Sequence, residues 1–263
     1  MEKIFCRPIT AFNFADLPFR LRITLALSVT ALGIAAIACL PPIPQDPGYH
    51  AFADGRSLRL IPNAGNVFSN ALFILAGVTG LLRLKSVKSI FLWRFFYCSI
   101  GLVGIGSAYY HLAPANLLLV SDRIPMSIGF ASVIAVMIAE RINEKAGGLL
   151  LFPLVFVGIR SVLYWYAGET SGVGDLRPYI AVQVLPILLI PMLILLFPER
   201  KSPADKSLLI LLAGYILAKV CEVEDGAIYI LTDHLISGHT LKHILAGASL
   251  FAFRPVPETK TAR

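Results

Sequence analysis

The feature that most constrains this chain is a series of apolar segments, each long enough, or nearly so, to cross a lipid bilayer. A transmembrane helix needs about 20 predominantly apolar residues. The fourth and seventh segments are short, so we expect them to tilt or to extend into the adjoining loops. Turn signals rich in Pro, Gly, Asn and Asp separate the segments. The eight predicted segments are 21–40, 66–84, 91–111, 124–140, 148–166, 179–197, 207–222 and 238–254.

The composition agrees with a membrane protein that crosses the bilayer several times. Of the 263 residues, 57% are hydrophobic and 15% are charged, whereas soluble domains are about a quarter charged. The net charge of +7 resides mainly in short loops between apolar segments, which argues against nucleic-acid binding. The first apolar segment follows a polar and aromatic tail, so we predict an anchor helix rather than a cleaved leader. The four cysteines stand alone, without the spacing of a disulfide framework or a cysteine metal site.

The distribution of basic residues predicts the orientation of the chain. With eight spans, both termini lie on one side, and that side carries 16 of the 23 Lys and Arg residues. By the positive-inside rule this side is cytoplasmic. The 16 residues are Lys3, Arg7, Arg20, Arg22, Arg83, Lys85, Lys88, Arg94, Arg141, Lys145, Arg200, Lys201, Lys206, Arg254, Lys260 and Arg263.

The opposite face collects the histidines. All five, which are His50, His111, His234, His239 and His243, lie on it or within one helical turn of it. His239 and His243 are four residues apart, so in a helix their side chains share one face. That spacing allows two imidazoles to bind one metal ion. The alternative is a pair of interfacial histidines hydrogen-bonded to loop carbonyls.

Three further residues extend this pattern. Ser107 and His111 also stand four apart, at the outer end of the third segment, and Asp122 opens the fourth. Three histidines leave an open fourth position, which is typical of catalytic zinc. Asp122 would then act as general base and Ser107 would stabilise an oxyanion. The alternatives are a carboxylate at a helix N-terminus paired with Arg123, a histidine at a helix end, and a serine bonded to its own helix.

These residues resemble the alkaline ceramidase family, which belongs to a wider group of seven-span membrane hydrolases that also includes the adiponectin-type receptors. The resemblance rests on Ser-x3-His, on Asp at the start of the next span, and on His-x3-His in the last. It runs from about Tyr49 to Ala252. The stretch NVFSN resembles the family's N-x-x-S-N at the start of its first core span, and the strings that resemble a bacterial branch are YHAFADGR, GSAYYHLAP, SDRIPMS, GDLRPY and SGHTLKH.

The resemblance implies an all-α integral membrane protein with a seven-helix core and one additional N-terminal span. We expect residues 1–48 to hold the tail, the additional span and a Pro-rich loop. Residues 49–254 form the catalytic core, and 255–263 form a cytoplasmic tail. The implied zinc ligands are His111, His239 and His243, with Asp122 and Ser107 beside the reacting water.

Other residues take smaller roles in this interpretation. Animal members bind calcium through an acidic segment before the core, and here only Asp54 and Asn63 offer oxygens at the corresponding place. The missing carboxylates argue against Ca²⁺, and the alternative is that Asp54 pairs with Arg56. Asn70 could hydrogen-bond a zinc ligand. We expect Lys242 to point away from the two histidines towards lipid headgroups.

The sequence therefore predicts a zinc-dependent amidase that cleaves ceramide, or a related lipid amide, to a long-chain base and a fatty acid. The resemblance favours a bacterial inner membrane, with both termini cytoplasmic and the zinc site towards the periplasm. One alternative is a lipid-binding receptor of the same superfamily, with structural zinc and no turnover. Another is a transporter, although the internal duplication common in transporters is absent from the sequence.

Overall fold

The structure is a computed structural model, and it describes residues 14–85, 87–198 and 203–255. Within these ranges the chain is all-α, as predicted. Apart from one isolated bridge between Leu58 and Ile61, the described residues form no β-structure. The α-helices are α1 Phe19–Ala38, α2 Ala64–Ser69, α3 Ala71–Arg83, α4 Ile90–Leu112, α5 Asn116–Arg141, α6 Glu144–Thr170, α7 Arg177–Leu196, α8 Pro203–Val223, α9 Asp225–Leu231 and α10 Gly238–Leu250.

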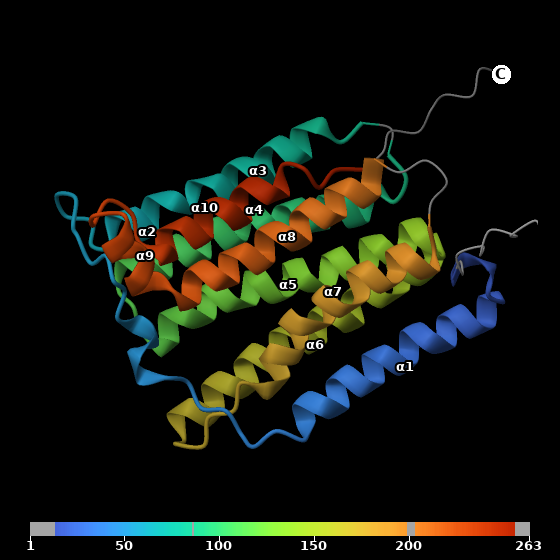
Figure 1. Ribbon diagram of the computed structural model, residues 1–263, viewed down its shortest axis with the longest axis horizontal. Coiled ribbons are helices and arrows are strands. Elements are labelled where there is room, and N and C mark those ends of the chain that lie inside the picture. Colours follow the sequence, from blue (N-terminus) through green and yellow to red (C-terminus); the bar gives the residue numbers. More distant parts are fainter. Residues whose placement is uncertain (1–13, 86, 199–202, 256–263) are drawn as a thin grey trace, which may run out of the picture.

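The long helices run side by side as an elongated bundle (Figure 1). Helix α5 lies at its centre and packs against α4, α6 and α7, while α10 packs against α8 and α3. Helix α1 lies along the outside of the bundle against α7. The short helices α2 and α9 and the loop before α2 gather at one end, and the end of α3 lies at the other. The first end carries the predicted site.

Six helical segments in the described ranges are long and apolar enough to cross a membrane. They are α1, α2 with α3 as one span, α4, α5, α6 and α7. This supports a multi-pass membrane protein. Helix α10 has 13 residues, or about 20 Å at 1.5 Å per residue, so it is too short to cross alone. Helix α8 has 21 residues but carries Asp205, Lys206, Lys219 and Glu222. Eight complete spans therefore stay a prediction.

The short fourth segment extends into the adjoining loop, as expected, and begins at Asn116, because the leucines at 117–119 continue the helix. Asp122 consequently lies in the second turn of α5, and its interpretation as a carboxylate at the start of a helix was wrong. The region expected to be a loop before the last segment contains α9.

The predicted orientation stays a prediction, although the described cations agree with its two-sided pattern. Arg83 ends α3, Arg94 lies in the first turns of α4, and Arg141 ends α5, whereas His111 lies at the far end of α4. Several residues on which the prediction depends lie outside the described ranges. These are Lys3, Arg7, Arg200, Lys201, Lys260 and Arg263. Cys6 and most of the predicted 255–263 tail also lie outside the described ranges. The described cysteines, Cys39, Cys98 and Cys221, are free.

The interior of the bundle is apolar at one end and polar at the other. Trp93, Phe96 and Val136 are among the buried residues of the apolar part. Buried polar groups are expensive within a membrane and mark functional sites by default. The polar residues buried near the histidine end are Asp54, Asn66, Asn70, Ser107, His111, Asp122, Arg123, Ser237, His239, Thr240 and His243.

The contact between α5 and α6 gives a stability test with a control one residue away. A Cβ atom at Gly147 would lie 2.5 Å from the Ala135 carbonyl oxygen and 2.6 Å from the Ala139 nitrogen, whereas a Cβ at Gly148 would meet nothing within 4 Å. We therefore expect Gly147→Ala to destabilise the protein by about 1–3 kcal/mol through overpacking. Gly148→Ala should leave stability unchanged or raise it slightly. Thermal unfolding in detergent measures both, and equal melting temperatures would contradict the packing.

Candidate metal centre

Three buried histidines from two helices meet at the polar end of the bundle. His111 comes from the last turn of α4, and His239 and His243 come from the first turns of α10. One ring nitrogen from each lies within 4.8 Å of the other two. The ring centroids are 4.9–5.0 Å apart. The structure thus brings together the three histidines that the sequence predicts to be ligands.

His111 has no hydrogen-bond partner for its ring. Its side chain is 0% exposed, and neither Nδ1 nor Nε2 has a partner in the described part of the chain. Leaving a buried polar atom unpaired costs about 1–3 kcal/mol. A ligand that accepts the lone pair of the imidazole would remove part of this cost.

The hydrogen bonds of His243 fix which of its nitrogens is free. The Ser69 hydroxyl lies 2.9 Å from His243 Nδ1 and donates its one proton to the Asn66 carbonyl oxygen at 3.0 Å. The Ser69 oxygen therefore accepts the Nδ1–H of His243, which leaves a lone pair on Nε2. Asn70, the predicted supporting residue, is farther away, with its Nδ2 3.5 Å from Nδ1. The sequence pattern did not assign this role to Ser69.

The start of α10 is held from two sides. The Ser237 hydroxyl accepts a hydrogen bond from the Thr240 amide at 3.1 Å and so caps the helix. The Asp225 carboxylate accepts one from the His239 amide at 2.7 Å and another from the Ala53 amide at 2.9 Å. This single carboxylate links the loop before α2 to the helix that carries two of the histidines.

Phe52 covers the histidines from the same loop. Its ring centroid lies 4.7 Å from that of His111 and 4.5 Å from that of His239. An apolar cover excludes water and strengthens electrostatic interactions beneath it. No periodic pattern in the sequence singles out Phe52, because it lies in a loop.

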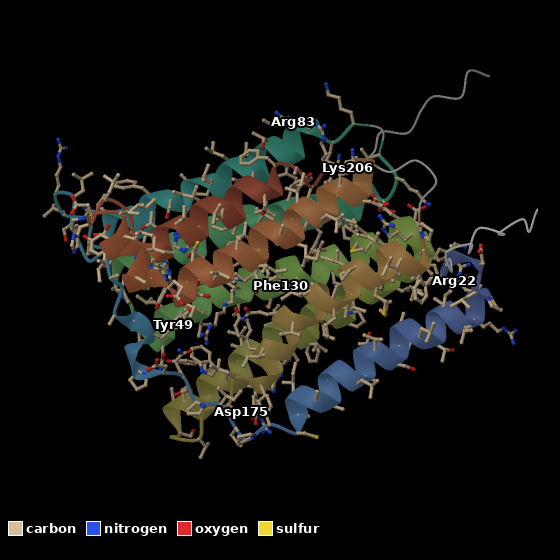
Figure 2. All side chains as sticks on the ribbon, viewed as in Figure 1. Arg22, Tyr49, Arg83, Phe130, Asp175 and Lys206 are labelled. Atoms are coloured by element: carbon tan, nitrogen blue, oxygen red, sulfur yellow. The ribbon has the colours of Figure 1, made fainter. Side chains whose placement is uncertain are left out.

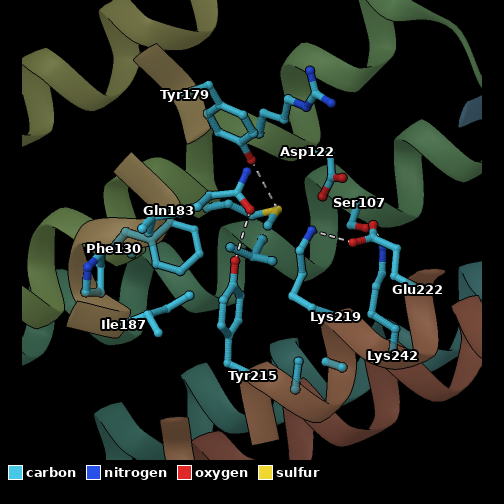
Figure 3. A pocket seen from close by; sticks show the side chains of 18 of the residues that line it. Ser107, Asp122, Phe130, Tyr179, Gln183, Ile187, Tyr215, Lys219, Glu222 and Lys242 are labelled. Carbon is cyan, nitrogen blue, oxygen red and sulfur yellow. Dashed lines mark hydrogen bonds and ion pairs between the residues drawn. The ribbon is translucent and has the colours of Figure 1, made fainter. Parts of the chain in front are cut away.

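Ser107 and Asp122 lie together because α4 and α5 approach closely beside them. A Cβ at Gly106 would meet the Ser121 carbonyl oxygen at 2.0 Å, so only glycine fits there. The Ser121 hydroxyl also donates to the Gly106 carbonyl oxygen at 3.1 Å. The Ser107 side chain lies beside the Asp122 carboxylate (Figure 3). Both side chains are buried.

An apolar cavity of about 530 Å³ opens next to these groups. Ser107, Asp122 and His243 line one part of it, and Ile100, Val133 and Ile190 are among its apolar walls. A cavity of this size with a few polar groups is typical of a small-molecule site. Tyr215 of α8 donates a hydrogen bond to the Gln183 side chain of α7 at 2.9 Å across it.

A buried ionic cluster also borders the cavity. Glu222 Oε1 accepts a hydrogen bond from Lys242 at 2.9 Å, and Lys219 pairs with the same carboxylate (Figure 3). Lys242 Nζ lies 2.9 Å from His239 Nε2 as well. The prediction that Lys242 points away towards headgroups was therefore wrong, because the partly buried Glu222 carboxylate on α8 pairs with the ammonium.

Arg123 does not pair with Asp122, contrary to the alternative raised from the sequence. Its Nη2 donates to Gln45 Oε1 at 2.7 Å. Its guanidinium carbon lies 4.1 Å from the ring centroid of Trp165 and 5.0 Å from that of Tyr179. Stacking on aromatic rings stabilises the cation without a carboxylate. Asp122 thus forms no ion pair with another residue of the described ranges.

The other two histidines lie apart from the cluster. His50 uses both ring nitrogens, with the Tyr110 hydroxyl at 2.8 Å and the Asn116 side chain at 2.9 Å. His234 packs against the Tyr229 ring. His50 therefore has no free nitrogen for a metal ion.

The two candidate calcium ligands are engaged elsewhere. Arg56 donates to both carboxylate oxygens of Asp54 at 2.8 Å, which lowers the pKa of that carboxyl. The Asn63 side chain donates to the His111 carbonyl oxygen at 2.9 Å. A guanidinium thus takes the carboxylate that a calcium ion would need, and these residues do not fit calcium.

The histidine cluster does fit a metal ion. Three imidazoles that each offer a ring nitrogen within 4.8 Å of the other two, one of them without any other partner in the described chain, match the nitrogen donor set that zinc prefers. The cluster is buried and borders a cavity, as a catalytic rather than structural site requires.

A comparison with known protein families returned a match. A model of the Ceramidase family matches residues 57–254, about three quarters of the chain. The match includes all three clustered histidines, Ser107 and Asp122. No curated protein sequence matches the chain.

The histidine cluster predicts that each chain binds zinc, and a variant of one histidine tests this prediction. We expect the purified protein to bind about one zinc ion per chain, and His111→Ala to lose it. His234→Ala is the matched control, since its ring lies outside the cluster. Ser69→Ala should weaken binding by about 10- to 100-fold, the usual effect of removing a hydrogen bond to a ligand. Elemental analysis and competition with a chelator measure both, and full zinc content in His111→Ala would refute the site.

Proposed function

Because the chain belongs to the Ceramidase family, which implies a hydrolase of amide bonds, we propose that it cleaves ceramide or a related lipid amide to a long-chain base and a fatty acid. The observation that carries this proposal is the meeting of His243, Ser107 and Asp122 on the wall of a largely apolar cavity. The lipid chains would lie along the apolar wall and the amide would lie at these three residues.

His111, His239 and His243 would hold the metal ion, and we propose zinc. When bound there, zinc would supply the Lewis acidity that activates water and polarises the amide carbonyl. The imidazoles are neutral donors, and the hydrogen bond to Ser69 keeps the lone pair of His243 on Nε2.

Asp122 is the proposed general base. Its carboxylate lines the cavity and has no ion pair in the described part of the chain, so it is available to a water molecule. It takes the proton of the attacking water and returns it to the amine when the C–N bond breaks. The products are a carboxylic acid and a free amine, so atoms and charge balance.

Ser107 is the proposed oxyanion donor. Its hydroxyl shares the cavity wall with Asp122, and a hydroxyl can donate to the carbonyl oxygen as that oxygen gains charge. Gly106 allows Ser107 and Asp122 to lie close together, because any larger residue at this position would push α4 and α5 apart.

Removing the proposed base should abolish turnover without removing the metal. We expect Asp122→Asn to lower ceramide hydrolysis by about 10²- to 10⁴-fold, the range for general base catalysis, at unchanged zinc content. Asp16→Asn, at an exposed position in the N-terminal turn, should retain full activity. Mass spectrometry of released fatty acid measures the rates. Lipid binding by the wild type without any fatty acid release would favour the receptor alternative.

The serine has a matched control on the facing helix. Ser107→Ala should lower kcat by about 10²- to 10³-fold, as loss of an oxyanion donor does, with little change in KM. Ser121→Ala removes a hydroxyl that bonds to the Leu118 and Gly106 carbonyl oxygens, so it should affect stability more than kcat. If both variants lost kcat equally, the assignment to Ser107 would be wrong.

A further inference from the structure

A second cavity lies at the end of the bundle opposite the histidines. Its volume is about 560 Å³. It is formed by the end of α3, the following loop, the start of α8 and the residues after α10. Leu250 lines both cavities, but none of the clustered histidines, Ser107 or Asp122 lines the second one.

Four cations line this cavity. They are Arg83, Lys85, Lys206 and Arg254, and no described residue of the lining is acidic. All four side chains are exposed. Arg83 and Lys206 are visible at the same end of the bundle in Figure 2.

These cations differ from several others in the protein. Arg56, Arg141, Arg177, Lys219 and Lys242 each pair with a carboxylate. The four cations of the second cavity make no ion pair with another described residue. Like charges around one hollow repel each other, and a bound anion would relieve that repulsion.

The rest of the lining is largely apolar. Ala76, Leu84, Val87, Leu250 and Phe251 face the same hollow. Cations above an apolar wall, at the ends of membrane helices, suit a molecule with an anionic head and hydrocarbon chains. A soluble phosphate ester would use the cations but not the apolar wall.

We propose that this cavity binds the phosphate-bearing headgroup of an anionic membrane lipid, with Arg83, Lys206 and Arg254 contacting the phosphate. The site is separate from the proposed catalytic centre, so its test requires neither zinc nor turnover.

The test uses the purified full-length protein in detergent. Phosphatidylglycerol and phosphatidylcholine of equal chain length are added separately, and native mass spectrometry and thermal unfolding report retained lipid and stabilisation. We expect phosphatidylglycerol to be retained and to raise the melting temperature, and phosphatidylcholine to do neither. The triple variant Arg83→Gln, Lys206→Gln, Arg254→Gln should bind phosphatidylglycerol on the order of a hundredfold more weakly, given the usual contribution of each basic residue.

The matched control removes the same charges elsewhere. Arg20→Gln, Lys145→Gln, Arg94→Gln takes away two arginines and one lysine that are exposed but do not line the cavity, and it should bind phosphatidylglycerol as the wild type does. If the triple site variant does not fold, Arg254→Gln alone should weaken binding about fivefold. Equal losses in the site and control variants would overturn the proposal in favour of general attraction. Equal protection by glycerol 3-phosphate would overturn the assignment to a lipid.

Discussion

The polar end of the bundle depends on one constraint, which is the burial of His111 with both ring nitrogens unpaired among the described residues. Burying such a side chain is costly, so the residues around it must be held in a fixed arrangement by other contacts. Ser69 sets the tautomer of His243, Asp225 fixes the start of α10, and Phe52 closes the site from the loop. Each contact comes from a different element, so the loop before α2 and helices α2, α9 and α10 are tied to α4 at one place.

Two cations near this place share one carboxylate. Glu222 pairs with Lys219 and Lys242 and also accepts a hydrogen bond from the Tyr49 hydroxyl at 3.1 Å. Lys242 at the same time contacts His239 Nε2, so a metal ion that took this nitrogen would displace the ammonium towards Glu222. The Glu222 carboxylate therefore holds the Lys242 ammonium close to the histidines and pairs with it there. Asp122 stays outside this cluster, because Arg123 is occupied by Gln45 and by aromatic rings.

Hydrophobic length and helical spacing account for the features that the sequence predicted correctly. The spacing of four placed His239 with His243, and Ser107 with His111, on shared helix faces, and the apolar segments located the membrane helices. The position of Asp122 within its helix was predicted incorrectly, because the run of leucines before it is equally compatible with a loop and with the start of a helix. The sequence did not predict the roles of Phe52, Ser69 and Asp225, and the predicted direction of the Lys242 side chain was wrong. These roles depend on contacts between distant segments, which no local pattern records.

Helix α10 connects the two ends of the molecule. With 13 residues it is shorter than the hydrocarbon core of a bilayer, about 30 Å, so lipid contact alone does not fix its position along the membrane normal. The capped start, with Asp225 and the two histidines, holds one end. The other end, at Leu250 and Phe251, forms a wall of the basic cavity. An anionic headgroup bound there would hold this end as a metal ion at the histidines would hold the first, so two ligands of opposite charge would fix one short helix from both sides.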